Sequence, residues 1–221
     1  MTVDFKDLRT KMVDNQVRTT DVTELRLISA MLDVPREAFV GADRRELAYI
    51  DEDIALSSTG EPRFLMEPSP FAKLVQLAAV GPQDVVLDIG CATGYSAAVL
   101  SRLASSVIAL ESDATLARQA TDTLSALGYD NVAVVEGPLK AGYAAEGPYD
   151  VIVLGGAVEE LPEALFGQMK EGGRLVAVVG YGNAGVANLY VKNAGVVGRA
   201  RGFNAAVKPL PGFRREAAFV F

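Results

Sequence analysis

The sequence contains no histidine, no tryptophan and a single cysteine, Cys91. Without histidine, the chain cannot form a Ser-His-Asp or Cys-His nucleophilic system, or a zinc site that uses imidazole ligands. We therefore expect no metal site. A single cysteine excludes an internal disulfide and favours a cytoplasmic protein. Cys91 is expected to be a small loop residue rather than a nucleophile, although a nearby helix N-terminus would lower its pKa.

The chain also has no excess of positive charge and no long apolar run. Its net charge of −7 disfavours binding to a polyanion such as DNA or RNA. No uncharged apolar stretch reaches transmembrane length, and the first residues do not resemble a signal peptide. We expect a cytoplasmic protein with no nucleic-acid partner and no membrane partner. At 221 residues and 50% hydrophobic content, the chain is long enough to fold as one compact unit.

The most informative segment is a small-residue loop between an apolar run and a helical pattern. The run ends in Asp88, and the loop extends from Gly90 to Gly94. Such turns hold nucleotides in α/β proteins, because glycine lets the backbone approach a ligand closely. The next apolar run ends in Glu111. A carboxylate at this strand tip is placed to accept hydrogen bonds from both ribose hydroxyls, so the sequence predicts a nucleoside site.

The residue after the loop helps to decide which ligand the loop holds. A dinucleotide-binding loop requires glycine at the position of Tyr95, and a Walker loop requires lysine there. The pattern Asp-x-Gly-x-x-x-Gly instead resembles the first motif of class I S-adenosylmethionine-dependent methyltransferases. Three alternatives stay open. The loop could bind nothing, Asp88 could only stabilise the turn, and Tyr95 could fill the core instead of supporting a ligand.

Strand and helix patterns alternate from Val85 onward, which predicts an α/β fold. Short β-branched runs between helices are typical of a Rossmann-like, mostly parallel, doubly wound sheet with helices on both faces. Asp113 is expected to cap a helix that Gly128 ends. The predicted strands are 85–88, 107–111, 132–135, 151–154 and 175–179. The predicted helices are 96–104, 113–127 and 162–170. Late antiparallel strands are expected at 188–192, 199–208 and 216–221.

A helical extension is expected before this core. An amphipathic helix is predicted over 20–32, with Leu25 on its apolar stripe, and a second over 71–80 with Ser69 as its N-cap. The polar segment 51–67 is expected to be a connection outside the core, either a functional lid or mobile. We predict a division into a helical extension with a substrate-side loop at 1–68 and a nucleotide-binding core at 69–221.

Several motifs follow one another in a fixed order along the chain. They are Met12-Val13-Asp14-Asn15-Gln16-Val17 and the segments 30–40, 48–51, 88–100, 127–132 and 172–176. With this order and spacing the chain resembles the protein-L-isoaspartate O-methyltransferases from about residue 11 to residue 180, and again at 209–212. This family belongs to the class I methyltransferases.

The resemblance implies a repair activity on damaged proteins. S-adenosyl-L-methionine would be the cofactor, S-adenosyl-L-homocysteine its product, and isoaspartyl-containing proteins or peptides the substrate. The isoaspartyl carboxylate is ionised at neutral pH, with a reference pKa of about 4, so methyl transfer to it requires no general base. The resulting ester would collapse to a succinimide and partly return to aspartate. The implied cofactor residues are Asp88, Gly90, Cys91, Ala92, Thr93, Gly94, Tyr95, Glu111, Gly137 and Pro138.

The chain departs from the family in the substrate-side segment. The family sequence Gly-Gln-Thr-Ile-Ser-Gln-Pro appears here as Pro62-Arg63-Phe64-Leu65-Met66-Glu67-Pro68. Met66 takes the serine position and offers no useful donor, while Glu67 adds a carboxylate that repels an anionic substrate. Arg63 either compensates by pairing with a carboxylate or lies solvated. Met66, Glu67 and Arg63 are the candidate catalytic-site residues.

A second departure follows the third predicted strand. The family sequence Gly-Asp-Gly, whose acid lies near the adenine, appears here as Gly137-Pro138-Leu139. The sequence leaves open whether Glu136 replaces that acid. These departures leave two alternatives to repair: a methyltransferase for another acceptor, and a non-catalytic binding or scaffold protein.

Overall fold

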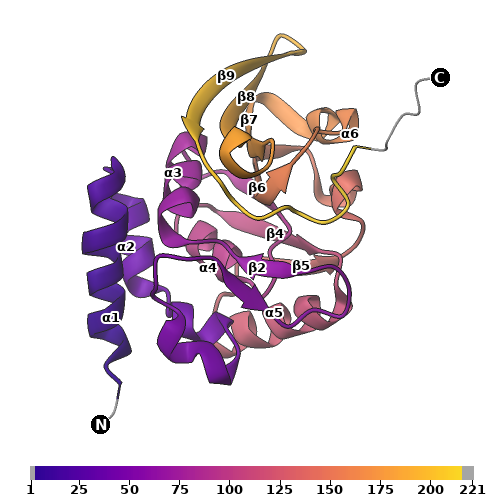
Figure 1. Cartoon of the computed structure of the whole chain (residues 1–221). Coiled ribbons are helices and arrows are strands. Elements are labelled where there is room, and N and C mark those ends of the chain that lie inside the picture. Colours follow the sequence, from indigo (N-terminus) through magenta and orange to yellow (C-terminus); the bar gives the residue numbers. More distant parts are fainter. Residues whose placement is uncertain (1–2, 216–221) are drawn as a thin grey trace, which may run out of the picture.

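A seven-stranded sheet runs through the centre of the molecule (Figure 1). The structure is a computed structural model that describes residues 3–215. The strand order is β5-β4-β3-β6-β7-β8-β9; the first five strands are parallel, and β8 and β9 are antiparallel. The bounds are β3 (Val85–Ile89), β4 (Ser106–Glu111), β5 (Val132–Glu136), β6 (Tyr149–Val158), β7 (Met169–Val179), β8 (Val186–Asn193) and β9 (Val196–Asn204).

Alternating side chains of the central strands form a core on each face of the sheet. Val86 and Val107 belong to one cluster, and Leu87 and Ile108 belong to the other. Helices α3 to α5 pack on the first face, while the short α6 packs beside β7. The predicted doubly wound architecture is confirmed. The helices are α3 (Pro68–Ala78), α4 (Tyr95–Ser101), α5 (Ala114–Ala126) and α6 (Glu163–Gly167).

The predicted ends of α5 are confirmed. Asp113 Oδ1 accepts hydrogen bonds from the backbone N–H groups of Thr115 and Leu116 at 2.9 and 3.1 Å. Gly128 follows the helix with φ of +74°, a conformation that glycine adopts without steric conflict.

The predicted helix 162–170 is wrong in its second half. Helix α6 ends at Gly167, and β7 already begins at Met169, which pairs with Tyr149. Gly172, with φ of +73°, lies within β7, where the register against β6 shifts. Such an irregularity is a common role of glycine in a strand, and it hides the strand from a search for alternating apolar residues.

The N-terminal segment is more helical than the sequence indicates. The predicted helix 20–32 begins only at Leu25, because Asp21, with φ of +65°, forms a turn before it. Leu25 was placed on the buried stripe and is in fact 73% exposed, whereas Leu27 and Met31 are buried. The segment comprises α1 (Phe5–Met12), a π-helical turn (Val13–Val17), α2 (Leu25–Asp33) and 3₁₀ turns at Arg18–Thr20, Arg36–Phe39 and Ala42–Leu47.

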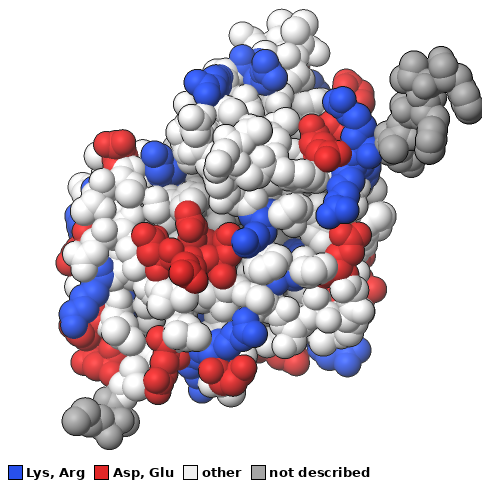
Figure 2. Space-filling model, viewed as in Figure 1, with Lys and Arg blue, Asp and Glu red and all other residues white. Residues whose placement is uncertain are grey.

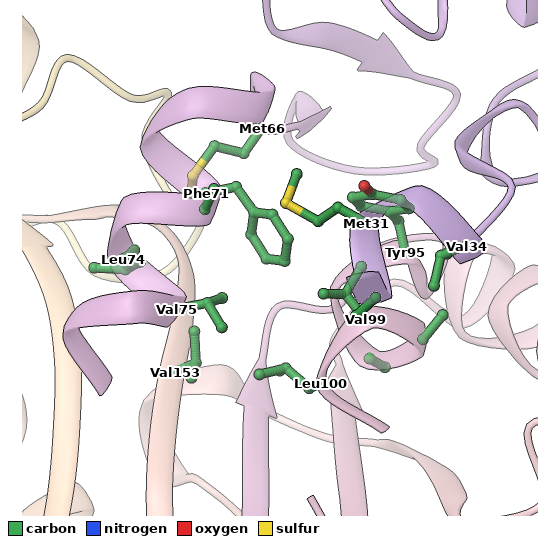
Figure 3. Packing of buried hydrophobic residues seen from close by; sticks show 14 of the residues in the cluster. Met31, Val34, Met66, Phe71, Leu74, Val75, Tyr95, Val99, Leu100 and Val153 are labelled. Carbon is green, nitrogen blue, oxygen red and sulfur yellow. The ribbon is translucent and has the colours of Figure 1, made fainter. Parts of the chain in front are cut away.

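Helices α1 and α2 lie side by side next to α3 (Figure 1). Figure 3 shows Met31 of α2 lying between Phe71 of α3 and Tyr95 of α4. Helix α3 starts three residues before its predicted start, with Glu67 rather than Ser69 at the N-cap, because Pro68 provides a helical φ at the first position. The N-terminal segment is therefore packed against the central helices.

The segment 51–67 is not the polar connection that we expected. It contains an antiparallel hairpin of β1 (Ile54–Leu56) and β2 (Arg63–Leu65). Ile54, Arg63 and Leu65 are buried. Strands of three residues are too short to give a detectable alternation, which is why the sequence pattern missed them.

The predicted antiparallel strand 188–192 is confirmed as part of β8, and the predicted strand 199–208 corresponds to β9 only as far as Asn204. After β9 the chain returns to the sheet, where Pro209 pairs with Ala157. The predicted strand 216–221 lies outside the described residues. Between residues 3 and 215, none of the helices has the length and apolar character needed to traverse a bilayer.

Candidate functional site

The loop between β3 and α4 adopts the conformation that its small residues permit. Gly90, Ala92 and Gly94 have φ values of +82°, +51° and +96°. The backbone N–H groups of Gly90 and Cys91 both donate to the carbonyl of Leu110 at the end of β4. The loop is thereby fixed against the strand that carries Glu111.

Glu111 is fully buried and forms an ion pair with Arg63. Arg63 Nη1 lies 2.6 Å from Glu111 Oε1, and Arg63 Nη2 donates to the carbonyl of Gly90 at 3.0 Å. The backbone N–H groups of Ala92, Ser112 and Asp113 also donate to the Glu111 carboxylate. The interpretation of Arg63 as a solvated side chain is wrong, because it is 4% exposed and its partner is the predicted ribose acid.

One cavity brings the loop together with the substrate-side segment. Met66 and Phe64 lie on one side of it, and Asp88, Gly90 and Tyr95 lie on the other. The remaining wall is mostly apolar, and Figure 3 shows Phe71 next to Met66, with Leu74 further along α3. The cavity is lined by Phe64, Leu65, Met66, Phe71, Leu74, Asp88, Gly90, Cys91, Ala92, Tyr95, Ser96, Val153, Leu154 and Gly155.

Asp88 contributes the carboxylate of this cavity. Ser96 donates a 2.6 Å hydrogen bond to Asp88 Oδ2. Asp88 Oδ1 is buried and has no hydrogen-bond partner among the described residues. Burial raises the pKa of Asp88 to about 7. A hydrogen-bond donor or a cation in the cavity would therefore satisfy an oxygen that the protein leaves unpaired.

Cys91, Thr93 and Tyr95 are all buried within or beneath the loop. Burial raises the pKa of the Cys91 thiol, so the helix N-terminus does not activate it. The hydroxyl of Thr93 donates to the carbonyl of Phe39 at 2.6 Å, which ties the loop to the N-terminal segment. The ring of Tyr95 packs against Phe39 and Phe71, with centroid distances of 5.8 and 5.6 Å.

Arg36 supports the site from beneath, and our sequence analysis did not identify it as a site residue. It is fully buried, and its Nε and Nη2 donate 2.7 Å hydrogen bonds to the carbonyls of Ala48 and Met66. Its guanidinium carbon lies 4.7 Å from the centroid of the Tyr95 ring. Arg36 therefore fixes both the Met66 backbone and the first residue of α4. Nothing in its sequence position, in a segment predicted to lie before the core, indicated this role.

A shallow cleft lies on the other side of Arg63, near the ends of β4 and β5. Glu136 lines it together with Thr59, Ser112 and Pro211. Gly137 continues the strand by donating to the carbonyl of Glu111 at 3.0 Å, and Pro138 is exposed. Glu136, the candidate for the missing acid, thus lines this cleft together with two other acidic residues, Glu61 and Asp113.

Glu67 lies outside the cavity, beside other acidic residues. Its backbone N–H donates to Asp53 Oδ1 at 3.0 Å. Partial burial and the neighbouring carboxylates of Asp53, Asp51 and Glu52 raise the pKa of Glu67. Figure 2 shows acidic side chains gathered near the middle of this face, with basic side chains next to them. The surroundings of the cavity are therefore rich in negative charge.

The structure thus brings Met66 close to the loop 88–95 and joins Arg63 to Glu111, while Glu67, Gly137 and Pro138 lie further out. Phe64, Ser96 and Leu210 are additional residues that sequence reasoning missed. Leu210 packs on the loop so closely that a Cβ at Gly90 would lie 2.5 Å from its Cδ1.

Comparison with known proteins identifies the family. A family model described as protein-L-isoaspartate(D-aspartate) O-methyltransferase matches residues 7–206. A protein-L-isoaspartate O-methyltransferase of Koribacter versatilis (strain Ellin345) is 36% identical over 204 residues, which cover 92% of this chain and 90% of that protein. One of Methanoregula boonei (strain DSM 21154 / JCM 14090 / 6A8) is 37% identical over 174 residues, or 79% of each chain.

Solved structures give the same result. A protein-L-isoaspartate O-methyltransferase superposes with a TM-score of 0.81 at 27% identity, covering 92% of this chain and 66% of that chain. A Plasmodium falciparum protein described as a putative member, in complex with S-adenosyl-L-homocysteine, has a TM-score of 0.76 at 21% identity and shows the shared fold. It is covered over 98% of its length, and this chain over 94%. From its sequence and its architecture, this chain belongs to the protein-L-isoaspartate(D-aspartate) O-methyltransferase family.

Proposed function

We propose that the protein transfers the methyl group of S-adenosyl-L-methionine to the free carboxylate of L-isoaspartyl residues in damaged proteins. The observation that carries this proposal is the shared cavity, in which the Asp88–Tyr95 loop faces Met66 of the substrate-side segment. A group transfer needs donor and acceptor in contact, and this is the place where both would meet. The family to which the chain belongs supports the choice of reaction.

The residues of the cavity suit S-adenosyl-L-methionine in their chemistry. The unpaired Oδ1 of Asp88 could accept from an ammonium group, such as that of the amino-acid end of the cofactor. Glu111, at the tip of β4, is the carboxylate for the ribose diol. Gly90 allows a ligand to approach the backbone. When bound, S-adenosyl-L-methionine supplies a methyl group on a positively charged sulfur.

The protein's own contribution to the reaction is positioning and the exclusion of water. An isoaspartyl carboxylate is ionised at neutral pH, so none of the residues has to remove a proton. The apolar side chains of Met66, Phe71 and Leu74 line the cavity, and in such surroundings a carboxylate is less hydrated and more reactive. Arg63 is the cation that would orient the acceptor carboxylate.

The same wall supports a second candidate, methyl transfer to a less polar acceptor. Met66 stands where the family has serine, and it is flanked by Phe64 and Phe71. None of these side chains donates a hydrogen bond to a carboxylate. An acceptor with a small apolar group next to the methylated atom would fit this wall better than a peptide carboxylate.

The proposal includes three statements about the whole protein. Residues 1–68 form the extension with the substrate-side loop, and residues 69–221 form the cofactor-binding core. The substrates are isoaspartyl-containing proteins or peptides, with no nucleic-acid or membrane partner. The single cysteine supports a cytoplasmic location, and the net charge of −7 supports the absence of a nucleic-acid partner.

The test is incubation of the purified protein with labelled S-adenosyl-L-methionine and a matched pair of peptides, one isoaspartyl and one aspartyl. Base-labile methyl ester on the isoaspartyl peptide alone is the expected result. A characterised family member run in parallel serves as the positive control. Absence of ester above background would overturn the repair assignment, and label on a small-molecule acceptor would favour the second candidate.

A further inference from the structure

We propose that Arg63 serves both halves of the site: it competes with the ribose for Glu111, and it contacts the acceptor carboxylate once a nucleoside has displaced it. The second half of this statement rests on the proposed function. The first half rests only on the ion pair and its surroundings. Arg63 would then determine both how tightly the nucleoside binds and which acceptors are accepted.

Arg63 occupies the place beside Glu111 that the ribose hydroxyls would take. Its guanidinium lies between Glu111 Oε1, at 2.6 Å, and the carbonyl of Gly90, at 3.0 Å. The backbone N–H groups of Ala92, Ser112 and Asp113 take up further acceptor positions of the Glu111 carboxylate. A diol that engages both oxygens of Glu111 can therefore bind only if Arg63 leaves Oε1.

Arg63 lies between a cleft and a pocket. It lines the cleft of Thr59, Ser112 and Glu136 on one side. On the other side it lines a pocket formed with Phe64, Met66 and Lys208, next to the cavity. Arg63 belongs to β2, a strand of three residues in a hairpin outside the main sheet. Movement of Arg63 from Glu111 into this narrow pocket would involve the hairpin, and the strand pairs of the main sheet would stay unchanged.

The net charge of that pocket changes when Arg63 is released into it. Asp53 and Lys208 are its other charged residues, and their charges balance. A released Arg63 would give the pocket one net positive charge, which matches one acceptor carboxylate. The carboxylates of Asp51, Glu52 and Glu67 lie near Asp53, so an anionic acceptor would be repelled without this additional cation. The nucleoside would thus prepare the acceptor pocket by taking Glu111 from Arg63.

Calorimetric titration with S-adenosyl-L-homocysteine tests the first half, and it needs no acceptor. If Arg63 occupies the ribose position in most molecules, only the remaining fraction can bind the ligand. The apparent association constant is then the intrinsic constant multiplied by that fraction. Arg63→Gln should then bind S-adenosyl-L-homocysteine about tenfold more tightly than the wild type. Arg118→Gln, an exposed position on α5, removes the same charge and should bind like the wild type. Equal or weaker binding by Arg63→Gln, including no binding by either protein, overturns the proposal.

Arg63→Lys provides a second variant if Arg63→Gln unfolds in a thermal melt. Lysine keeps the charge but cannot bridge Glu111 and Gly90 with two separate nitrogens, so its affinity for S-adenosyl-L-homocysteine should lie between the other two. Affinity no higher than that of the wild type contradicts a blocking role.

Steady-state kinetics with an isoaspartyl peptide test the second half. Arg63→Gln should raise the KM for the peptide at least about tenfold, with a smaller change in kcat, because it removes a contact to the ground-state carboxylate. An unchanged KM overturns the acceptor contact. If the wild type does not methylate the peptide at all, the proposed function fails, while the S-adenosyl-L-homocysteine titrations still decide whether Arg63 blocks the nucleoside.

Discussion

The hydroxyl of Ser96 donates a 2.6 Å hydrogen bond to one oxygen of the Asp88 carboxylate, and the other oxygen is buried without a partner among residues 3–215. Burial raises the pKa of this carboxyl to about 7, compared with an ordinary value of 3.8. The folded protein therefore holds a proton on Asp88 at pH values where the unfolded chain has released it.

This proton makes the stability of the protein depend on pH. Between about pH 4 and pH 7 the folded state binds more protons at Asp88 than the unfolded state does, so the free energy of unfolding falls as the pH rises. In Asp88→Asn this loss is absent. In urea unfolding, the free energy of unfolding of the variant should rise relative to that of the wild type by on the order of 2–3 kcal/mol between pH 5 and pH 8. Parallel pH profiles for Asp88→Asn and the wild type would contradict the burial of an unpaired carboxyl, and the exposed substitution Asp122→Asn is the control.

Removal of Glu111 should affect stability and cofactor binding together. Glu111→Ala leaves Arg63 buried without its partner, and such a change typically costs about 3–5 kcal/mol of unfolding free energy. It should also weaken binding of S-adenosyl-L-methionine by at least about tenfold, because the ribose loses its acceptor. Calorimetric titration below the melting temperature measures the second effect.

A double variant separates the two effects of Glu111. Arg63→Gln combined with Glu111→Gln removes both charges and should recover much of the lost stability, but not the affinity for S-adenosyl-L-methionine. Unchanged affinity in Glu111→Ala would mean that the ribose lies elsewhere.

Met66→Ser restores the hydroxyl that the family carries at this position. If the methionine limits the repair reaction, the variant should methylate an isoaspartyl peptide several-fold faster than the wild type, because the serine can donate to the acceptor carboxylate. Met66 is 8% exposed, so the substitution should also lower stability by about 2 kcal/mol or more. The matched control is Met66→Ala, which makes a similar cavity without a hydroxyl. Equal rates for the two variants would exclude a role for the serine.

Arg36→Lys tests the support beneath the site. Lysine has one nitrogen in place of the two that reach the carbonyls of Ala48 and Met66, so at least one carbonyl loses its present donor, and each unsatisfied buried carbonyl costs about 1–3 kcal/mol. The variant should therefore unfold at lower urea concentration than the wild type. Arg45→Lys, at an exposed position nearby in the chain, should unfold like the wild type. An equal loss in both variants would contradict a specific role for Arg36.

The frame of the site could be predicted from the sequence, because it depends on local chemistry. A buried strand that ends in Asp88, a loop of small residues and a helix form a continuous pattern, and the acid at the tip of β4 follows from the same alternation. The cap at Asp113 and the glycine at 128 are also local signals. Each of these features is determined by residues that are neighbours in the chain.

The partners of the site residues could not be predicted, because they come from distant parts of the chain. Arg63 and Glu111 are 48 residues apart, and Arg36 and Met66 are 30 residues apart. The hairpin that carries Arg63 has strands of only three residues. A charged residue in a polar stretch is usually solvated, and only the tertiary fold shows that Arg63 is buried.

Gly155 and Gly90 place two backbone segments in direct contact at the base of the cavity. A Cβ at Gly155 would lie 2.7 Å from the carbonyl oxygen of Gly90, so no other residue fits between the ends of β6 and β3. This part of the site is made of main chain, whereas Phe64, Met66 and Arg63 on the opposite side contribute through their side chains. Point substitutions at Phe64 or Met66 can therefore alter the acceptor while the main-chain contact of Gly90 with Gly155 stays intact, whereas a substitution of Arg63 alters both halves of the site.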